Sequence, residues 1–142
     1  MIAVLPIIAA AALYFLVVFG VGVLLGPMRV FWLEPRIGET AATLAEAPFL
    51  LAAILIAARA IPKRLGVRAD MAPLAGVGVV ALLLQQLADL ALGSLLRGIT
   101  PAQQLARLER PAGLIYLALV VVFALMPLAA NWPRRRAGHP EP

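Results

Sequence analysis

The polar residues with the greatest potential for chemistry form two short series, each within an apolar stretch. The first series is Glu39, Thr43 and Glu46, and the second is Gln85, Gln86 and Asp89. Residues three, four or seven positions apart share one face of an α-helix, so each series forms a polar stripe if its stretch is helical. Such stripes could bind a solute, an ion or a proton, could supply an acid and a base, or could simply hydrogen-bond to each other.

Charged residues that could interact with these stripes lie near the ends of the same stretches, and the arginines among them could neutralise the carboxylates. The candidate charge partners are Arg29, Glu34, Arg36 and Arg97. Direct pairing would give the stripes a structural role, because a satisfied polar network fixes how helices fit together. An open, wet cavity would instead favour the binding of a solute, an ion or a proton. The sequence alone leaves both interpretations open, together with an intramembrane catalytic site.

Familiar catalytic and metal-binding signatures are missing. The chain has no cysteine, and its single histidine, His139, lies in the polar C-terminal tail. No HExxH, GxSxG or phosphate-binding loop occurs. We therefore predict no catalytic residues, no metal site and no cofactor. Tyr14 and Tyr116 are interpreted as packing or interface residues.

The composition indicates that lipid is the solvent of this chain. Of its 142 residues, 63% are hydrophobic and 13% are charged. Soluble domains are roughly 45–50% apolar and about 25% charged. A small water-soluble fold could not bury so much apolar surface. The net charge of +5 does not indicate nucleic-acid binding, because the basic residues stand mostly beside apolar runs, where they would orient a membrane protein.

Apolar runs predict four transmembrane helices, over about 3–26, 41–61, 72–96 and 112–130. Each has about the 20 residues that a helix needs to cross the hydrocarbon core. The fold class is therefore all-α, a polytopic four-helix bundle in one domain (1–131) with a short basic tail (132–142). Pro35 is expected to disfavour helix at Glu34 and to start a new helix. Thr100 and Pro101 predict an N-cap and the start of a short helix in the interface plane.

An even number of spans brings both termini and the middle connection to one side of the membrane. The basic residues expected on that side are Arg59, Lys63, Arg64, Arg68, Arg134, Arg135 and Arg136, against Arg29, Arg36, Arg97, Arg107 and Arg110 on the other. The positive-inside rule then predicts cytoplasmic termini. Because the second and third spans are antiparallel, Glu46 and Asp89 fall in the same, non-cytoplasmic half of the membrane.

Glycines are the candidates for close helix packing. Gly22 and Gly26 form a GxxxG pattern at the end of the first span, and Gly76 and Gly78 lie early in the third. Small residues let helices approach closely in lipid. We expect packing within one chain, with dimerisation as the alternative.

Two stretches resemble segments of small uncharacterised four-span inner-membrane proteins of bacteria. One runs from Gly26 to Arg59, and the other is TPAQQLARLERPAGLIYLALVVVFALMPLA. The similarity is greatest at Arg29, Glu34, Pro35, Arg36, Gly38, Glu39 and Glu46. The resemblance implies a bacterial inner membrane and a four-span layout, and it implies no activity.

The function expected first is that of a non-enzymatic structural or accessory component of a membrane assembly. Its partners would be the lipid bilayer and other membrane subunits or further copies of itself, with no nucleic acid. The alternative is a small oligomeric channel or transporter that uses a buried Glu/Asp/Gln cluster between the second and third spans. A membrane enzyme comes third, because it would have to use these carboxylates as acid and base.

Overall fold

A computed structural model describes residues 4–96 and 98–133. Within these ranges the chain is helical and has no strand, which confirms the all-α fold class. The helices are α1 (Val4–Met28), η1 (Arg29–Leu33), α2 (Glu34–Ile37), α3 (Glu39–Arg64), α4 (Met71–Leu96), α5 (Pro101–Arg107) and α6 (Pro111–Ala130). The predictions that concern Arg97, Arg134, Arg135, Arg136 and His139 lie outside the described residues.

Four helical segments are long and apolar enough to cross a membrane. They are Val4–Ile37, Glu39–Arg64, Met71–Leu96 and Pro111–Ala130. This supports a multi-pass membrane protein and agrees with the number and order of spans expected from the sequence. The second span extends beyond its predicted end at residue 61, because Pro62 is accommodated inside α3 and buried.

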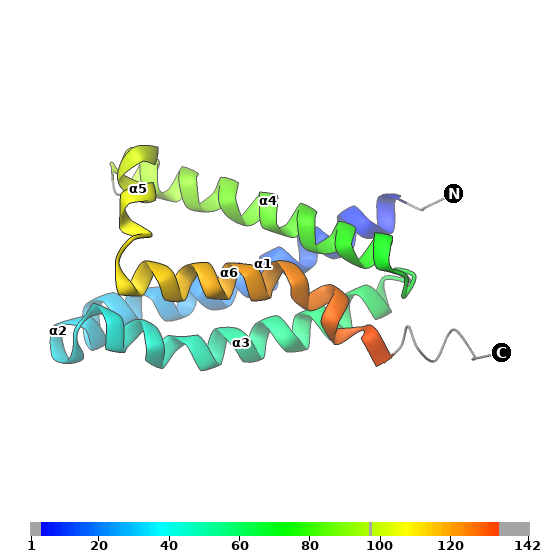
Figure 1. The fold of residues 1–142 in the computed structure, drawn as a ribbon, viewed down its shortest axis with the longest axis horizontal. Helices are drawn as coiled ribbons and strands as arrows, with labels where there is room; N and C mark the ends of the chain where they lie inside the picture. The colour runs from blue at the N-terminus through cyan, green and yellow to red at the C-terminus, as the bar shows by residue number, and fades with distance from the viewer. Residues whose placement is uncertain (1–3, 97, 134–142) are drawn as a thin grey trace.

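The long helices form a four-membered ring in which each packs against two neighbours. Its order is α1, α3, α6, α4, so α3 and α4 lie diagonally opposite each other, as do α1 and α6. Figure 1 shows that α1 begins and α6 ends at the same end of the bundle, close to the α3–α4 connection. The opposite end carries α2 and α5. The α3–α4 connection thus lies at one end of the bundle and the connections with α2 and α5 lie at the other, as expected when successive helices run antiparallel.

The first connection is more helical than the sequence predicts. The expectation that Pro35 would keep Glu34 out of a helix is wrong, because Glu34 has the right-handed helical angles φ −59° and ψ −43°. A π-helical turn, Arg29–Leu33, precedes the proline, and the Glu34 N–H donates to the Arg29 carbonyl. This wider turn lets the helix continue to a proline that cannot donate its own hydrogen bond. The chain reverses only at Gly38, whose φ of +87° suits glycine.

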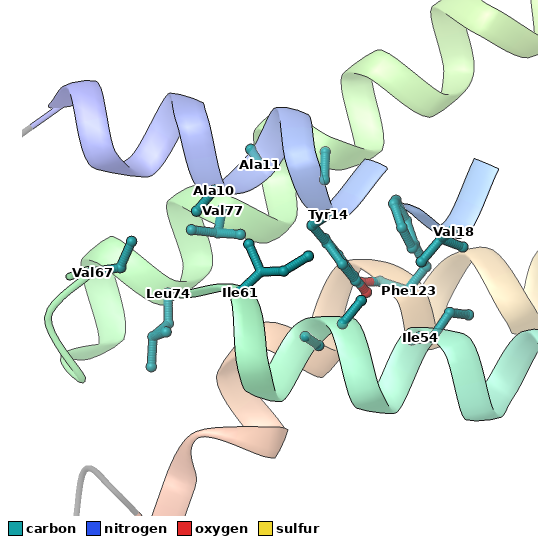
Figure 2. Close-up of a cluster of buried hydrophobic side chains, with 13 residues drawn as sticks. Ala10, Ala11, Tyr14, Val18, Ile54, Ile61, Val67, Leu74, Val77 and Phe123 are labelled. Carbon is teal, nitrogen blue, oxygen red and sulfur yellow. The ribbon is translucent and has the colours of Figure 1, made fainter. Parts of the chain in front are cut away.

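An aromatic pair joins the diagonal between α1 and α6 at the centre of the bundle. Tyr14 is fully buried, and its ring stacks on that of Phe123 with centroids 4.5 Å apart. Figure 2 shows the two side chains turned toward each other among Ile54, Ile61 and Val77. The Tyr14 hydroxyl donates to the Phe123 carbonyl at 2.6 Å, which satisfies its polar end in an apolar core. This pair fills the centre of the bundle between α1 and α6 and thereby stands between α3 and α4.

Two contacts hold α6 against its neighbours. A Cβ atom at Gly78 of α4 would lie 2.0 Å from the Ala124 carbonyl oxygen, so α4 and α6 approach to a distance that only glycine permits. Asn131 is buried, and its amide donates to the carbonyls of Ala58 at 2.8 Å and Pro127 at 2.7 Å. These bonds fix the end of α6 to α3 where a helix would otherwise leave unpaired carbonyls.

Candidate functional site

Arg29 is the centre of the first polar group, at the end of the first span. Its Nη1 lies 2.5 Å from Glu34 Oε1, and its Nε lies 2.5 Å from Glu46 Oε2. The Nε contact is a close pairing of opposite charges whose angle does not make it a hydrogen bond. The Glu46 side chain is only 10% exposed. One guanidinium thus pairs with two carboxylates from different helical segments, and ionisable residues within spans usually pair in this way with one another.

The π-helical turn explains how Arg29 reaches both acids. Glu34 follows Arg29 by one such turn, so both side chains lie on one side of the helix. Glu46 comes from α3, which antiparallel packing brings alongside α1 and η1. The group therefore links the first two spans across their short connection.

The remaining residues of the first stripe lie outside this group. Glu39 is exposed at the start of α3, and the Thr43 hydroxyl donates to its carbonyl at 2.8 Å. Arg36 is also exposed, with its guanidinium 5.2 Å from the centre of the Trp32 ring. A cation over a tryptophan face is attracted to its π system. These residues lie on the surface at the α2 end of the bundle. Of the first stripe, only Glu46 pairs with Arg29.

Asp89 is the centre of the second polar group, between α4 and α6. The Tyr116 hydroxyl donates to Asp89 Oδ2, and the Gln85 amide donates to Asp89 Oδ1 at 3.1 Å. The Gln86 amide in turn donates to the Tyr116 hydroxyl at 3.4 Å. The three residues of the second stripe are therefore joined in one hydrogen-bonded group through Asp89 and Tyr116. Among residues 4–96 and 98–133, no cation pairs with Asp89.

The short helix α5 also contributes to the second group. The Gln104 amide donates to the Asp89 backbone carbonyl at 2.9 Å. Gly93, one turn further along α4, makes room for it, because a Cβ there would lie 2.7 Å from the Gln104 side-chain amide nitrogen. The side-chain oxygen of the same residue, Gln104 Oε1, is buried and has no hydrogen-bond partner among the described residues. Thus α5 is attached to α4 by the Gln104 side chain, which occupies the space that a Cβ at Gly93 would take.

The two stripes do not share an interface. Glu46 lies on α3 and Asp89 on α4, and these helices form a diagonal of the bundle. The structure brings Glu46 to Arg29 and Asp89 to Tyr116, on separate helix pairs. The predicted cluster is thus divided into an Arg29 group and an Asp89 group. Arg29 shortly precedes α2, and Asp89 lies in the last turns of α4, which leads to α5. Both groups therefore lie toward the end of the bundle that carries α2 and α5 (Figure 1).

Sequence reasoning missed Tyr116 and Gln104. Tyr116 lies in the first turns of α6, and Asp89 lies in the last turns of α4. Consecutive antiparallel spans bring such positions to a similar depth, so matching depth was the available signal for Tyr116. No comparable signal exists for Gln104, because its contact depends on the fold of the α4–α5 connection.

The four candidate packing glycines behave in two ways. Gly76 and Gly78 lie against other helices: a Cβ at Gly76 would be 3.2 Å from the Ile7 methyl Cγ2, and Gly78 contacts Ala124 as described. Cβ atoms at Gly22 and Gly26 would meet nothing within 4 Å. The glycines of α4 therefore pack inside the chain, and those of α1 leave an open surface.

The chemistry that these groups can perform is narrow. Among the described residues, no three acidic or histidine side chains gather as metal ligands. A groove of about 390 Å³ along α5 and an apolar hollow of about 500 Å³ near Trp132 are lined by other residues than Glu46 or Asp89.

Comparisons with protein-family models, with curated proteins and with solved structures found no match for this chain.

Proposed function

We propose that this chain is a multi-pass protein of a bacterial inner membrane that serves as a non-enzymatic structural or accessory component of a membrane assembly. The observation that carries the proposal is the pairing of Glu46 with Arg29, at 2.5 Å and with little exposure. A carboxylate held in this way joins two spans and is not free to bind a solute. The proposed orientation, with both termini cytoplasmic, is supported by the positive-inside rule.

The surface around Gly22 and Gly26 supports association with another membrane subunit. Neither position meets a neighbour within the chain, although each is only partly exposed. Small residues on a lipid-facing helix allow another helix to approach closely, and van der Waals packing is a main driving force for helix association in lipid. The proposed partner is a transmembrane helix of another subunit, and a second copy of this chain is the competing outcome.

A bulky residue at Gly22 tests this surface. Gly22→Leu is expected to reduce the crosslinked partner adduct by at least about tenfold in native membranes, because the side chain fills the space of the incoming helix. The thermal midpoint of the purified chain is expected to stay unchanged, since a Cβ at Gly22 meets nothing within 4 Å. The measurement is photo-crosslinking of the full chain followed by mass analysis of the adduct.

Gly20→Leu is the matched control. Gly20 also has open space around its Cβ position, and it lies about 200° around the helix from Gly22. We expect this control to retain the adduct. An adduct that survives Gly22→Leu, or a wild-type chain that yields no adduct, would count against the proposal. An adduct of twice the chain's mass would identify a homo-oligomer in place of a foreign subunit.

The second candidate function is a small oligomeric channel or transporter, and the Asp89 group favours it. Gln86, Tyr116 and Asp89 form a continuous hydrogen-bonded series within the membrane-spanning region. Intramembrane carboxylates of this kind often mark ion or proton routes. In this form of the proposal the route would use Asp89 and not the pair Glu46 and Asp89 together.

Flux measurements separate the two functions. If the chain is a transporter, Asp89→Asn should abolish proton or sodium flux into liposomes that contain the wild-type chain, because it removes the only carboxylate of that group. Arg36→Gln, an exposed change outside both groups, should leave flux intact. Wild-type liposomes as tight as protein-free ones would eliminate this candidate and leave the structural role.

A further inference from the structure

A basic groove runs along α5, at the end of the bundle where α4 ends and α6 begins. It is an open surface groove of about 390 Å³. The lining residues are Ile99, Gln103, Ala106, Arg107 and Arg110. Gln103, Ala106 and Arg107 are three and four positions apart and follow one side of α5, and Arg110 stands at the N-cap of α6.

The helix that forms this groove is held firmly on both sides. Thr100 Oγ1 accepts from the Gln103 N–H at 3.2 Å, and Gln103 Oε1 accepts from the Thr100 N–H at 3.0 Å. This capping box confirms the predicted helix start. Gln104 fastens the helix to α4, as described above. On the other side, a Cβ at Gly113 of α6 would lie 2.3 Å from the Arg107 carbonyl, so α5 ends directly against α6.

The groove is complementary to a phosphate. Arg107 and Arg110 line it, no acidic residue does, and neither arginine forms an ion pair within residues 4–96 and 98–133. Guanidinium groups bind phosphate oxygens through paired charge-assisted hydrogen bonds. Gln103 adds an amide, and Ile99 and Ala106 add apolar walls suited to the carbon atoms next to a phosphate ester.

The position of the groove indicates whether that phosphate belongs to a lipid headgroup or is free in solution. Figure 1 shows α5 lying crosswise to the four long helices, at the end of α4. A helix that crosses the ends of transmembrane spans lies at the depth of lipid headgroups. Leu105, on α5 itself, is 67% exposed and would reach the acyl chains beside it. We propose that this groove binds the phosphate of an anionic phospholipid headgroup.

The test is a lipid titration of the purified full chain followed by native mass spectrometry. The probes are short-chain phosphatidylglycerol and phosphatidylcholine with the same acyl chains, together with inorganic phosphate. We expect phosphatidylglycerol to bind more tightly than phosphatidylcholine. Arg107→Gln with Arg110→Gln should weaken phosphatidylglycerol binding by roughly tenfold or more, because two charge-assisted contacts are lost.

A charge-matched control distinguishes a site from general attraction. Lys63→Gln with Arg64→Gln removes the same charge at the other end of the bundle and should change phosphatidylglycerol binding by less than about twofold. Arg107→Lys with Arg110→Lys keeps the charge and should weaken binding less than the glutamine pair does, which provides a measurement even if the glutamine pair fails to fold. Equal loss in the control, or equal binding of both lipids, overturns the proposal. Competition by inorganic phosphate at the lipid's own concentration would assign the groove to free phosphate and overturn the lipid assignment.

Discussion

Gly78→Ala is expected to lower the free energy of unfolding of the bundle by about 3 kcal/mol, at the upper end of the overpacking range. The new methyl group would lie 2.0 Å from the Ala124 carbonyl oxygen, which is a backbone atom and cannot rotate away. The helices α4 and α6 would have to separate, and the contacts on both sides of that point would be lost. The measurement is reversible unfolding in mixed micelles, followed by the loss of helical signal.

Two other glycines provide the controls for this change. A Cβ at Gly76 would meet only the Ile7 methyl at 3.2 Å, and a side-chain methyl can move by a few tenths of an ångström. Gly76→Ala should therefore destabilise the bundle much less than Gly78→Ala. Gly20→Ala meets nothing within 4 Å and should be neutral or slightly stabilising, since alanine favours helix. Equal effects at Gly20 and Gly78 would refute the close approach of α4 and α6.

Arg29→Gln is expected to destabilise the bundle by about 3 kcal/mol, in the range for removing one partner of a buried pair. Glu34 and Glu46 would then lose the guanidinium that lies 2.5 Å from each of them. The Glu46 side chain, at 10% exposure, would be left charged within a span or would have to take up a proton. The measurement is the same unfolding titration.

A second variant in this test also removes the Glu46 carboxylate, which Arg29→Gln leaves without its cation. Adding Glu46→Gln to Arg29→Gln should recover at least about half of the lost stability, because no carboxylate then remains unpaired on α3 at this point. Arg36→Gln is the control, since this exposed arginine contacts Trp32 and pairs with neither acid. A double variant as unstable as Arg29→Gln alone would show that the pair does not act as a unit.

The spans could be predicted from sequence because hydropathy acts locally. Each span is an apolar run of sufficient length with charges near its ends, and Thr100 and Pro101 mark the start of the short helix α5. The first connection was harder to predict. Pro35 normally ends a helix, and no sequence rule announces that a π-helical turn will carry the helix through Glu34 to Ile37.

The arrangement of the candidate site could be predicted only within each helix. Gln85, Gln86 and Asp89 act as one stripe, as their spacing implies. Which helix faces that stripe depends on packing across the whole bundle, where Gly78 brings α6 to α4, and Tyr14 and Phe123 occupy the diagonal. Depth along the membrane was therefore readable for Glu46 and Asp89, but their separation on opposite helices was not.

The position of Asp89's partners has a consequence for synthesis. The chain emerges from the ribosome N-terminus first, so α4 is complete before Gln104 and Tyr116 have been made. During that interval Asp89 has only Gln85 as a hydrogen-bond partner, and Gly78 has no Ala124 to receive it. A chain truncated after Leu96 would remain in that state. The last third of the sequence therefore supplies the groups that complete the surroundings of Asp89 and Gly78, so these two positions of α4 reach their final contacts only when α5 and α6 have been added.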